Sequence, residues 1–373
     1  MGVDVVPVVS RSDLKKFVLF PFKLFGESDN WVPPIIKDEL DTFNPRINPA
    51  FEHCESEQFL AYRGDQIVGR IACIADSNET QEKGLARFGW IDFIDDHEVS
   101  EALISTAKNW AEKRELKGIH GPLGFTDMDY EGMLVEGFQH AATIATIYNF
   151  PYYPEHLEKL GFEKSVDWVE GRGTVPKEPS KKLLRTAQLV ESRFGIKSLK
   201  FKTRRQAARR GREMFHVLNR SYENLYGFHP LTEKQIDFYI KQYLGFVIPD
   251  LMSMVVNKDD ELVGFAVTMP SLTRAFQKAR GRLFPFGFLH ILRSMKTETS
   301  ADMYLIGVLP EYQKMGATAI VFRDIIQAYN KRGITTAMTN QVLEQNAHLL
   351  TQFNDYQEEG AIYKRRRCYI KNF

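Results

Sequence analysis

Apolar residues along the chain alternate between strand-like runs and helix-like spacing. Residues 59–62 and 67–74 are short apolar runs separated by Gly64-Asp65, a pair that favours a tight turn, so they predict a β-hairpin. In residues 98–114 and 181–194 apolar side chains recur three or four positions apart, which predicts amphipathic helices. This mixture predicts an α+β (α/β mixed-sheet) protein in which helices flank a mixed central sheet.

The stretch from Met303 to Lys331 reads as a strand, a sharp turn and a long helix. Residues 304–308 form the strand, Pro310 ends it, and helical spacing begins near Ala319. The turn between them, residues 313–318, would place several unpaired backbone N–H groups at a helix N-terminus, beside small residues that allow close approach. Because that geometry binds phosphate, the turn is a candidate anion cradle, and an ordinary strand-to-helix turn is the alternative.

The two halves of the chain repeat one another. Residues 57–76, EQFLAYRGDQIVGRIACIAD, match residues 252–271, MSMVVNKDDELVGFAVTMPS, and residues 90–118 match 304–333 in their order of strand, helix and glycine. We therefore expect two copies of one fold. The expected boundaries are a first domain over residues 1–178, a linker helix over 179–195 and a second domain over 196–373.

Composition narrows the class of protein. The chain is 43% hydrophobic and 26% charged, as globular proteins are, and its net charge of +1 gives no global attraction to nucleic acid or to an anionic membrane. Three cysteines without a CxxC spacing argue against a disulfide framework and a cysteine zinc site, so we expect no metal. No apolar run is long enough for a membrane span, and the N-terminal pattern is not that of a signal peptide. These features predict a soluble, cytoplasmic protein.

The motif around the turn resembles that of a known superfamily. Ile306-Gly307-Val308-Leu309-Pro310-Glu311-Tyr312-Gln313-Lys314-Met315-Gly316 is similar to the acyl-CoA pyrophosphate motif of the GNAT (GCN5-related N-acetyltransferase) superfamily, although Thr318 stands where that superfamily has Gly or Ala. Leu343-Glu344-x-Asn346 and Gly360-x-x-x-Lys364-x-Arg366-x-x-Tyr369 are similar to the ends of tandem GNAT-like bacterial proteins. The resemblance covers nearly the whole chain, as two GNAT-like domains in tandem.

The first copy departs from this pattern. Residues 93–99, Phe-Ile-Asp-Asp-His-Glu-Val, replace the glycine-containing turn and place three acidic side chains where a pyrophosphate would sit. Repulsion between like charges would cancel the attraction of the helix end for an anion. We expect the first copy to be a degenerate GNAT-like domain and the second to hold the acyl-CoA.

The resemblance implies roles for individual residues. Tyr356, four residues before Gly360, is the candidate acid for the leaving thiolate, and a helix-face aromatic packed on the sheet is its alternative. Glu344 is a weakly placed candidate base, whose alternative is a solvated charge. Asn340 and Asn346 could bind pantetheine or cap the helix. The residues implied in binding the co-substrate, acetyl-CoA or another acyl-CoA, are Ile306, Gly307, Val308, Gln313, Lys314, Met315, Gly316, Ala317, Thr318, Asn340 and Asn346.

Three functions follow from these residues. The leading hypothesis is an acyl-CoA-dependent N-acyltransferase that transfers an acetyl group to a small-molecule or peptide amine. The sequence is compatible with a homodimer. The second is a non-catalytic GNAT-like binding or scaffold protein, because the first copy is degenerate and no base is evident. The third starts from residues 197–212 and 365–367, which are rich in Arg and Lys and could contact a nucleic acid; the resemblance implies that such a protein would be a transferase that uses aminoacyl-tRNA. A solvated helix face explains those cations more simply, which disfavours a nucleic-acid partner. The acidic loop 127–131 could bind a cationic amine or simply form a turn.

Overall fold

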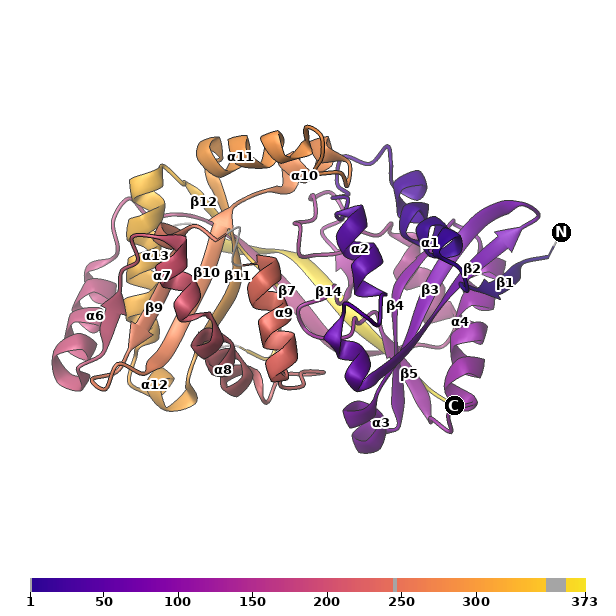
Figure 1. The fold of residues 1–373 in the computed structure, drawn as a ribbon, viewed down its shortest axis with the longest axis horizontal. Helices are drawn as coiled ribbons and strands as arrows, with labels where there is room; N and C mark the ends of the chain where they lie inside the picture. The colour runs from indigo at the N-terminus through magenta and orange to yellow at the C-terminus, as the bar shows by residue number, and fades with distance from the viewer. Residues whose placement is uncertain (1, 244–246, 347–359) are drawn as a thin grey trace. The chain divides into compact units, whose positions relative to one another are not determined.

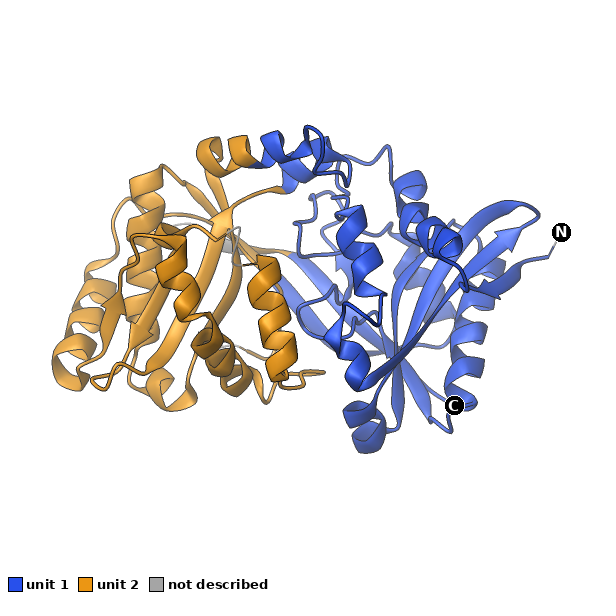
Figure 2. Ribbon diagram, viewed as in Figure 1, with its two compact units in different colours: residues 1–169, 273–291, 364–373 blue, residues 170–272, 292–363 orange. Residues whose placement is uncertain are grey.

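The computed structural model describes residues 2–243, 247–346 and 360–373 (Figure 1). It divides into two compact units (Figure 2). Unit 1 contains Met1–Val169, Thr273–Ile291 and Lys364–Phe373, and unit 2 contains Glu170–Leu272 and Leu292–Tyr363. Each unit is therefore built from separate stretches of chain.

Unit 1 is a mixed sheet in the order β1-β2-β3-β4-β5-β14, with β6 on the edge of β14. Neighbouring strands are antiparallel, except that β4 and β5 are parallel. The strands are β1 (Asp4–Pro7), β2 (Cys54–Arg63), β3 (Gln66–Asp76), β4 (Leu85–Phe93), β5 (Gly118–Gly121), β6 (Met133–Glu136) and β14 (Gly360–Asn372).

Helices cover both faces of this sheet. Alternate residues of β3 point to opposite sides, because side chains alternate along a strand. Ile71 packs with Leu103 of α4 on one side, and Ala72 packs with Phe17 of α1 on the other. The helices of unit 1 are α1 (Arg11–Leu24), α2 (Ile36–Thr42), the 3₁₀ turn η1 (Pro49–Glu52), α3 (Ser77–Lys83), α4 (His97–Glu112), α5 (Tyr152–Lys159) and α10 (Thr273–Ala279).

Unit 2 repeats the arrangement in the order β8-β9-β10-β11-β12-β7, with β13 on β7. Here β11 and β12 are the parallel pair. The strands are β7 (Glu163–Thr174), β8 (Lys197–Leu199), β9 (Met252–Val256), β10 (Leu262–Pro270), β11 (Ser300–Val308), β12 (Thr336–Thr339) and β13 (Val342–Leu343). Helix α8 packs on β10 and β11, whereas α13 packs on β9, β10 and α6. The helices are α6 (Lys181–Phe194), α7 (Arg204–Arg209), α8 (Gly211–Tyr222), α9 (Glu233–Tyr243), the 3₁₀ turn η2 (Pro249–Leu251), α12 (Pro310–Lys314) and α13 (Thr318–Arg332). Helix α11 (Gly287–Thr297) begins in unit 1 and ends in unit 2.

The predicted duplication and mixed sheets are confirmed. The hairpin β2–β3 corresponds to β9–β10, and the crossover β4-α4-β5 corresponds to β11-α13-β12. Trp90 and Tyr304, which the repeat aligns, both lie where the strand register shifts. Trp90 also has a positive φ of 44°. The two copies therefore share a strand irregularity as well as an order of elements.

The last strand of each half lies in the other unit. From Glu170 onward β7 belongs to unit 2, where Arg172 faces Met338 of β12. From Lys364 onward β14 belongs to unit 1, where Tyr369 faces Gly121 of β5. The compact units therefore differ from the continuous ranges 1–178 and 196–373, because strand pairing, not chain order, decides which sheet a strand completes.

Other differences from the predictions are local. Residues 205–222, whose sequence predicts one helix, form two helices that meet at Arg210, and no apolar pattern predicts α2 or α3. Residues 347–358, for which the sequence predicts a further helix, lie outside the described residues. Among the helices that are described, none combines the length and apolar character needed to cross a bilayer.

Candidate active site

The parallel ladder between β11 and β12 ends in the middle of β11. Its last pair is Met303 with Thr339, whereas β11 continues beside β10 as far as Val308. Asn340 closes the ladder, because its backbone N–H donates to the Met303 carbonyl at 3.0 Å and its Nδ2 donates to the Tyr304 carbonyl at 3.3 Å. On that side, the described strands form no further pair with residues 304–308. The two strands thus separate and leave a backbone edge of β11 open.

The open edge is accessible and polar. Tyr304, Leu305 and Ile306 are each partly exposed. The hydroxyl of Tyr222, at the end of α8, donates to the Ile306 carbonyl at 3.1 Å. Tyr304 donates to Asp302 Oδ2 at 3.2 Å, and burial together with the Asp302 charge raises the pKa of Tyr304 well above its usual value. Tyr304 is therefore a neutral hydrogen-bonding group near neutral pH.

Asn340 also carries a spare acceptor at this point. Its Oδ1 is buried and accepts no hydrogen bond from the described residues. The amide orientation follows from the Tyr304 carbonyl, which needs a donor and so must face the NH₂ group. An unsatisfied buried oxygen costs about 1–3 kcal/mol. A ligand N–H that entered here would remove that cost.

The turn after β11 is more closed than the sequence predicts. The N–H groups of Gly316 and Ala317 donate to the carbonyls of Gln313 and Tyr312, at 2.9 and 3.1 Å. Those of Ala319 and Ile320 donate to Gly316 and Ala317, at 2.9 and 3.0 Å. The predicted set of unpaired N–H groups is therefore wrong for this conformation. An N–H group at a helix end often donates to two acceptors at once. The N–H groups of this turn can therefore still donate to a bound anion.

Some side chains of the turn are buried and others are exposed. Gln313 turns back and donates to the Val308 carbonyl at 2.7 Å, and Ala317 and Thr318 are buried. Gly316 has a φ of +86°, and a Cβ there would lie 3.3 Å from Val190 of α6. Lys314 and Met315 are exposed. The linker helix thus packs against the glycine, and Lys314 is the cation of the turn that faces solvent.

Other predicted site residues have varied positions. Gly307 and Val308 are buried in β11, and Ile306 lies at its open edge. Glu344 and Asn346 are partly exposed beyond β13. The Asn346 backbone N–H donates to the Leu343 carbonyl at 2.8 Å. Tyr356 lies outside the described residues.

In the first copy, a carboxylate of the protein itself lies at the corresponding turn. Asp96 caps α4, its Oδ1 accepting from the Glu98 backbone N–H at 3.0 Å. Arg63 pairs with Asp96 at 2.5 Å and with Glu98 at 2.7 Å. The hydrogen bond from Arg63 holds the pKa of Asp96 below its usual value. A protein carboxylate therefore occupies the helix end where the second copy has its turn.

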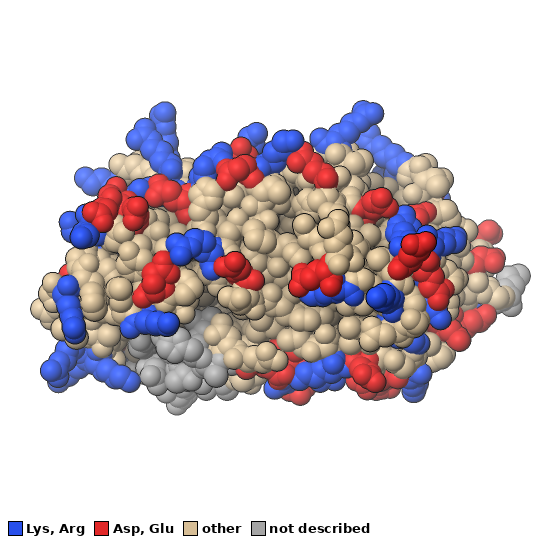
Figure 3. Space-filling view, turned by 90° about the horizontal axis from the view of Figure 1, so that it is seen from below, with Lys and Arg blue, Asp and Glu red and all other residues tan. Residues whose placement is uncertain are grey.

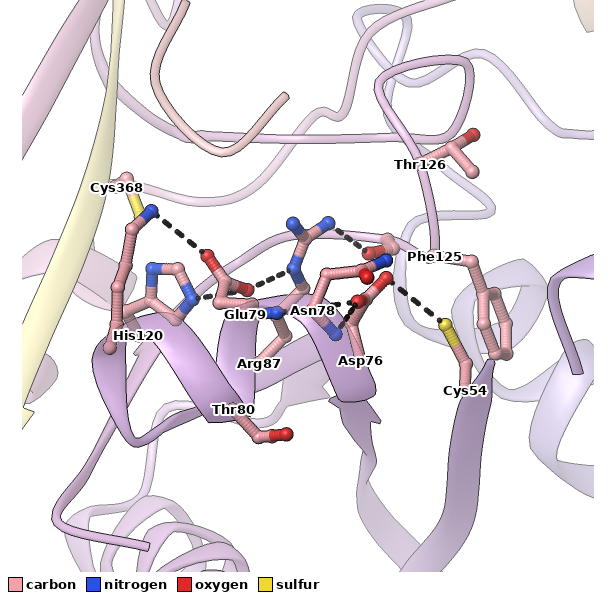
Figure 4. A network of polar contacts seen from close by, with 12 residues as sticks. Cys54, Asp76, Asn78, Glu79, Thr80, Arg87, His120, Phe125, Thr126 and Cys368 are labelled. Atoms are coloured by element: carbon pink, nitrogen blue, oxygen red, sulfur yellow. Dashed lines mark hydrogen bonds and ion pairs between the residues drawn. The ribbon is translucent and has the colours of Figure 1, made fainter. Parts of the chain in front are cut away.

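Unit 1 also contains a buried charge network (Figure 4). Glu79 accepts from Arg87 at 2.6 Å and lies 3.1 Å from Nε2 of His120. Burial alone would raise the pKa of Glu79, but the His120 hydrogen bond and the Arg87 charge outweigh it and hold the pKa below its usual value. Arg87 also donates to the Gly124 carbonyl at 3.1 Å. These contacts fasten α3 to β4 and β5, which is a structural role.

His53, Cys54 and Asp76 form the one His, Cys, Asp or Glu cluster within the described residues whose spacing could suit a metal ion. The Cys54 thiol donates to Asp76 Oδ2 at 3.4 Å, as Figure 4 shows, and His53 lies 3.5 Å from the same oxygen. Burial raises the pKa of Cys54. In this arrangement the thiol is a protonated hydrogen-bond donor.

Four further carboxyl groups of unit 1 have raised pKa values. Burial raises the pKa of Glu39 to about 7, that of Asp127 to about 7 and that of Asp129 to about 6, and it raises that of Glu131 well above its usual value. Asp129 shapes the loop, since its Oδ2 accepts from the backbone N–H groups of Phe125 and Thr126 at 2.9 and 3.1 Å. The turn explanation is thereby supported for Asp129.

Several cations of the two basic stretches pair with acidic side chains. Arg210 pairs with Glu213 at 2.8 Å, and Arg367 pairs with Asp167 at 2.8 Å. Arg366 is fully buried. On the face drawn in Figure 3, cations and anions are interspersed. Further pairs are Lys200 with Asp324, Arg212 with Glu233 and Asp237, and Arg365 with Glu136 and Asp167.

Comparisons with known proteins agree with this architecture. No family model matches the sequence. The chain is 28% identical over 375 residues to Protein YghO of Escherichia coli (strain K12), covering 97% of this chain and 94% of that protein. It is 28% identical over 320 residues to the protein named Bacterial ceramide synthase of Caulobacter vibrioides (strain NA1000 / CB15N), covering 83% and 82%.

A solved structure shares the fold over its full length. It is a tandem GNAT protein from the clavulanic acid biosynthesis pathway, which matches with a TM-score of 0.55 and 11% identity over 99% of this chain and 98% of that chain. At this identity the likeness concerns the fold alone. The duplicated mixed sheets, the parallel crossover in each copy and this match together show that the chain has the tandem GNAT-like fold.

Proposed function

We propose that the protein is an acyl-CoA-dependent N-acyltransferase whose donor binds in the second copy. The observation that carries the proposal is the open edge of β11 beside the buried Oδ1 of Asn340, which accepts no hydrogen bond from the described residues. An extended chain with amide groups can pair with such an edge as an added strand would. Pantetheine has that chemistry, and the edge leads directly into the α12–α13 turn.

Different residues would then bind different parts of the acyl-CoA donor. The backbone of residues 306–308 and the Asn340 side chain would hold the pantetheine arm. Lys314 and the N-terminal end of α13 would attract the pyrophosphate, because the helix end carries partial positive charge. Arg220, which pairs with Glu311 at 3.0 Å beside the turn, is a second cation near it. Along the chain, we assign the donor site to residues 196–373, the linker to residues 179–195 and the degenerate copy to residues 1–178.

The reaction itself is simple to balance. The amine nitrogen forms a bond to the thioester carbonyl carbon, the C–S bond breaks, and the thiolate takes up a proton as the amine loses one. Tyr356 is the proposed donor of the proton to the thiolate, and Glu344 the proposed acceptor of the amine proton. The backbone of the β11 edge would position the thioester for attack.

The acceptor class is suggested by one relative. The name of the Caulobacter protein refers to ceramide, which is the N-acyl derivative of a long-chain amino alcohol. That is the product of N-acyl transfer to an amine. We therefore propose a long-chain amine as the first acceptor to test, ahead of small-molecule and peptide amines, with acetyl and long-chain acyl donors compared.

The experiment is a turnover assay that follows release of free CoA thiol and identifies the amide by mass spectrometry. The proposal predicts thiol release that depends on both acyl-CoA and amine, in the cytoplasmic pH range. Saturable acyl-CoA binding without turnover on any amine of the panel would favour the non-catalytic binding protein instead. For a transferase that uses aminoacyl-tRNA, the pairing of Arg210 with Glu213 and of Arg367 with Asp167 removes part of the positive charge that a tRNA would contact.

A further inference from the structure

Helices α10 and α11 and the segment between them carry positive charge without any compensating acid. From Leu262 to Thr297 the sequence contains no Asp or Glu. The cations of this stretch are all exposed, and within the described residues none of them forms an ion pair. They are Arg274, Lys278, Arg280, Arg282, Arg293 and Lys296. In a chain of net charge +1 this is a local and unneutralised basic surface.

The same segment exposes large apolar side chains. Phe284 and Phe286 are 78% and 70% exposed, and Leu289 and Leu292 are each 50% exposed. On α11 the buried residues are Gly287 and Ile291, so the helix has one face inward and presents the two leucines outward. Aromatic and leucine side chains surrounded by Lys and Arg are typical of elements that lie in a membrane interface.

A hollow of about 460 Å³ lies within this surface. Three of the five residues that line it are Lys or Arg, which favours an anion such as a phosphate group. The residues that line it are Arg274, Gln277, Lys278, Arg280 and His290.

The part of this surface that belongs to unit 1, residues 273–291, is held in place by the rest of that unit. Gln277 Nε2 donates to the carbonyls of Asp29 and Trp31, at 2.6 and 3.2 Å. The Ile36 N–H donates to the Gly281 carbonyl at 3.0 Å. Gly281 has a φ of +71°, and a Cβ there would lie 2.6 Å from Phe22, so only glycine fits this close approach. The exposed phenylalanines therefore follow a segment that is firmly seated on α1 and the start of α2.

We propose that residues 273–296, the interfacial segment, dock the protein on the surface of an anionic phospholipid membrane. Phe284, Phe286, Leu289 and Leu292 enter the headgroup region, and the basic hollow takes a headgroup phosphate. Charge complementarity selects this partner, because a zwitterionic surface offers no net attraction to a surface of this charge. The proposal goes beyond acyl transfer and does not depend on it, since docking needs neither acyl-CoA nor an amine.

Co-sedimentation of the full-length protein with vesicles tests the proposal. Vesicles of phosphatidylcholine alone are compared with vesicles that also contain phosphatidylglycerol, without acyl-CoA. We expect the protein to sediment with the anionic vesicles and to be released by high salt, because screening weakens the charge attraction. If the protein sediments with neither kind of vesicle, the proposal is overturned and an acidic protein surface is left as the partner.

Two sets of variants separate docking from misfolding. Arg280→Gln and Arg282→Gln should each lower partitioning into anionic vesicles roughly fivefold, whereas Lys113→Gln, an exposed lysine at the end of α4, should not. Phe284→Ser should lower it at least about tenfold. Leu289→Ser should weaken it, and its match Leu189→Ser, a 56% exposed leucine on α6, should leave it unchanged. If the variants of the interfacial segment bind as the wild type does, the assignment of this surface is wrong.

Discussion

The side-chain amide of Asn340 donates to the carbonyl of Tyr304 at 3.3 Å, one residue beyond the last pair of the β11–β12 ladder. This contact replaces the next rung of the ladder with a side chain. It therefore marks the point at which the two parallel strands part. The buried Oδ1 of the same amide has no partner among the described residues, so one residue both ends the ladder and offers an acceptor to a ligand.

Replacing Asn340 should affect both stability and donor binding. Asn340→Ala removes one donor and one acceptor, so we expect a loss of about 1 kcal/mol in the free energy of unfolding and about a fivefold loss in acyl-CoA affinity. Denaturant unfolding and calorimetric titration measure the two effects. The matched control is Asn330→Ala, which removes a bond of 3.0 Å from an asparagine to the Pro176 carbonyl, elsewhere in unit 2. Equal acyl-CoA affinity in the two variants would contradict the role of Asn340.

Gly316 tests the turn. Gly316→Ala forces an L-residue to a φ of +86° and brings a Cβ to 3.3 Å from Val190, so we expect a loss of about 1–2 kcal/mol in stability and weaker acyl-CoA binding. Gly333→Ala is the control, because Gly333 has a φ of +70° at the other end of α13 and nothing within 4 Å of its Cβ position. It should lose about 1 kcal/mol and keep its acyl-CoA affinity. If both variants lose affinity alike, the effect comes from α13 as a whole.

Glu39 predicts a pH dependence of stability. Burial raises its pKa from 4.5 to about 7, while Trp90 Nε1 donates to its Oε2 at 2.8 Å. Between these values the folded state keeps a proton that the unfolded state has released, so stability falls as pH rises from about 4.5 to about 7. Glu39→Gln should remove up to about 3 kcal/mol of that fall. The exposed Glu82→Gln should not, and identical pH profiles for wild type and Glu39→Gln would disprove the assignment.

Asp96 tests whether the first copy is closed to the donor. Asp96→Ala removes the cap of α4 and a partner of Arg63, so we expect a loss of about 1 kcal/mol in stability at neutral pH. Because the pKa of Asp96 is lowered, that difference should fade as pH falls through its titration range. Acyl-CoA stoichiometry and affinity should stay at the wild-type values. A change in either would show that the first copy takes part in donor binding.

The sequence predicted the elements that have strong periodicity, and it missed what depends on side-chain hydrogen bonds. Helix α6 was expected over 181–194 and has those bounds. Helix α3, SNETQEK, has no apolar period and depends on its cap, since Asp76 accepts from the N–H groups of Asn78 and Glu79 at 2.8 and 3.4 Å. The exchange of β7 and β14 could not be predicted, because a strand's alternation says which face is buried but not which sheet it joins.

In the candidate site, too, the sequence predicted the elements and missed the side-chain hydrogen bonds. The motif located the strand, the turn and Asn340, because their spacing is a matter of chain order. Tyr222 was missed, since nothing in the sequence of its helix indicates that its hydroxyl would reach the Ile306 carbonyl. The closure of the turn was missed for a similar reason. Whether a backbone N–H at a helix start is paired depends on the exact path of the chain through Gly316, which the Gln-x-x-Gly spacing does not fix.

Isothermal titration of the full-length protein with acetyl-CoA and a long-chain acyl-CoA tests the central claim, that the second copy alone binds the donor. The account predicts one binding site per chain for at least one of the two donors. It also predicts that Gly316→Glu abolishes this binding, because a carboxylate would fill and repel the mouth of the turn, whereas Asp96→Ala retains it. Two sites per chain, unchanged binding in Gly316→Glu, or no heat with either donor up to millimolar concentration would contradict it.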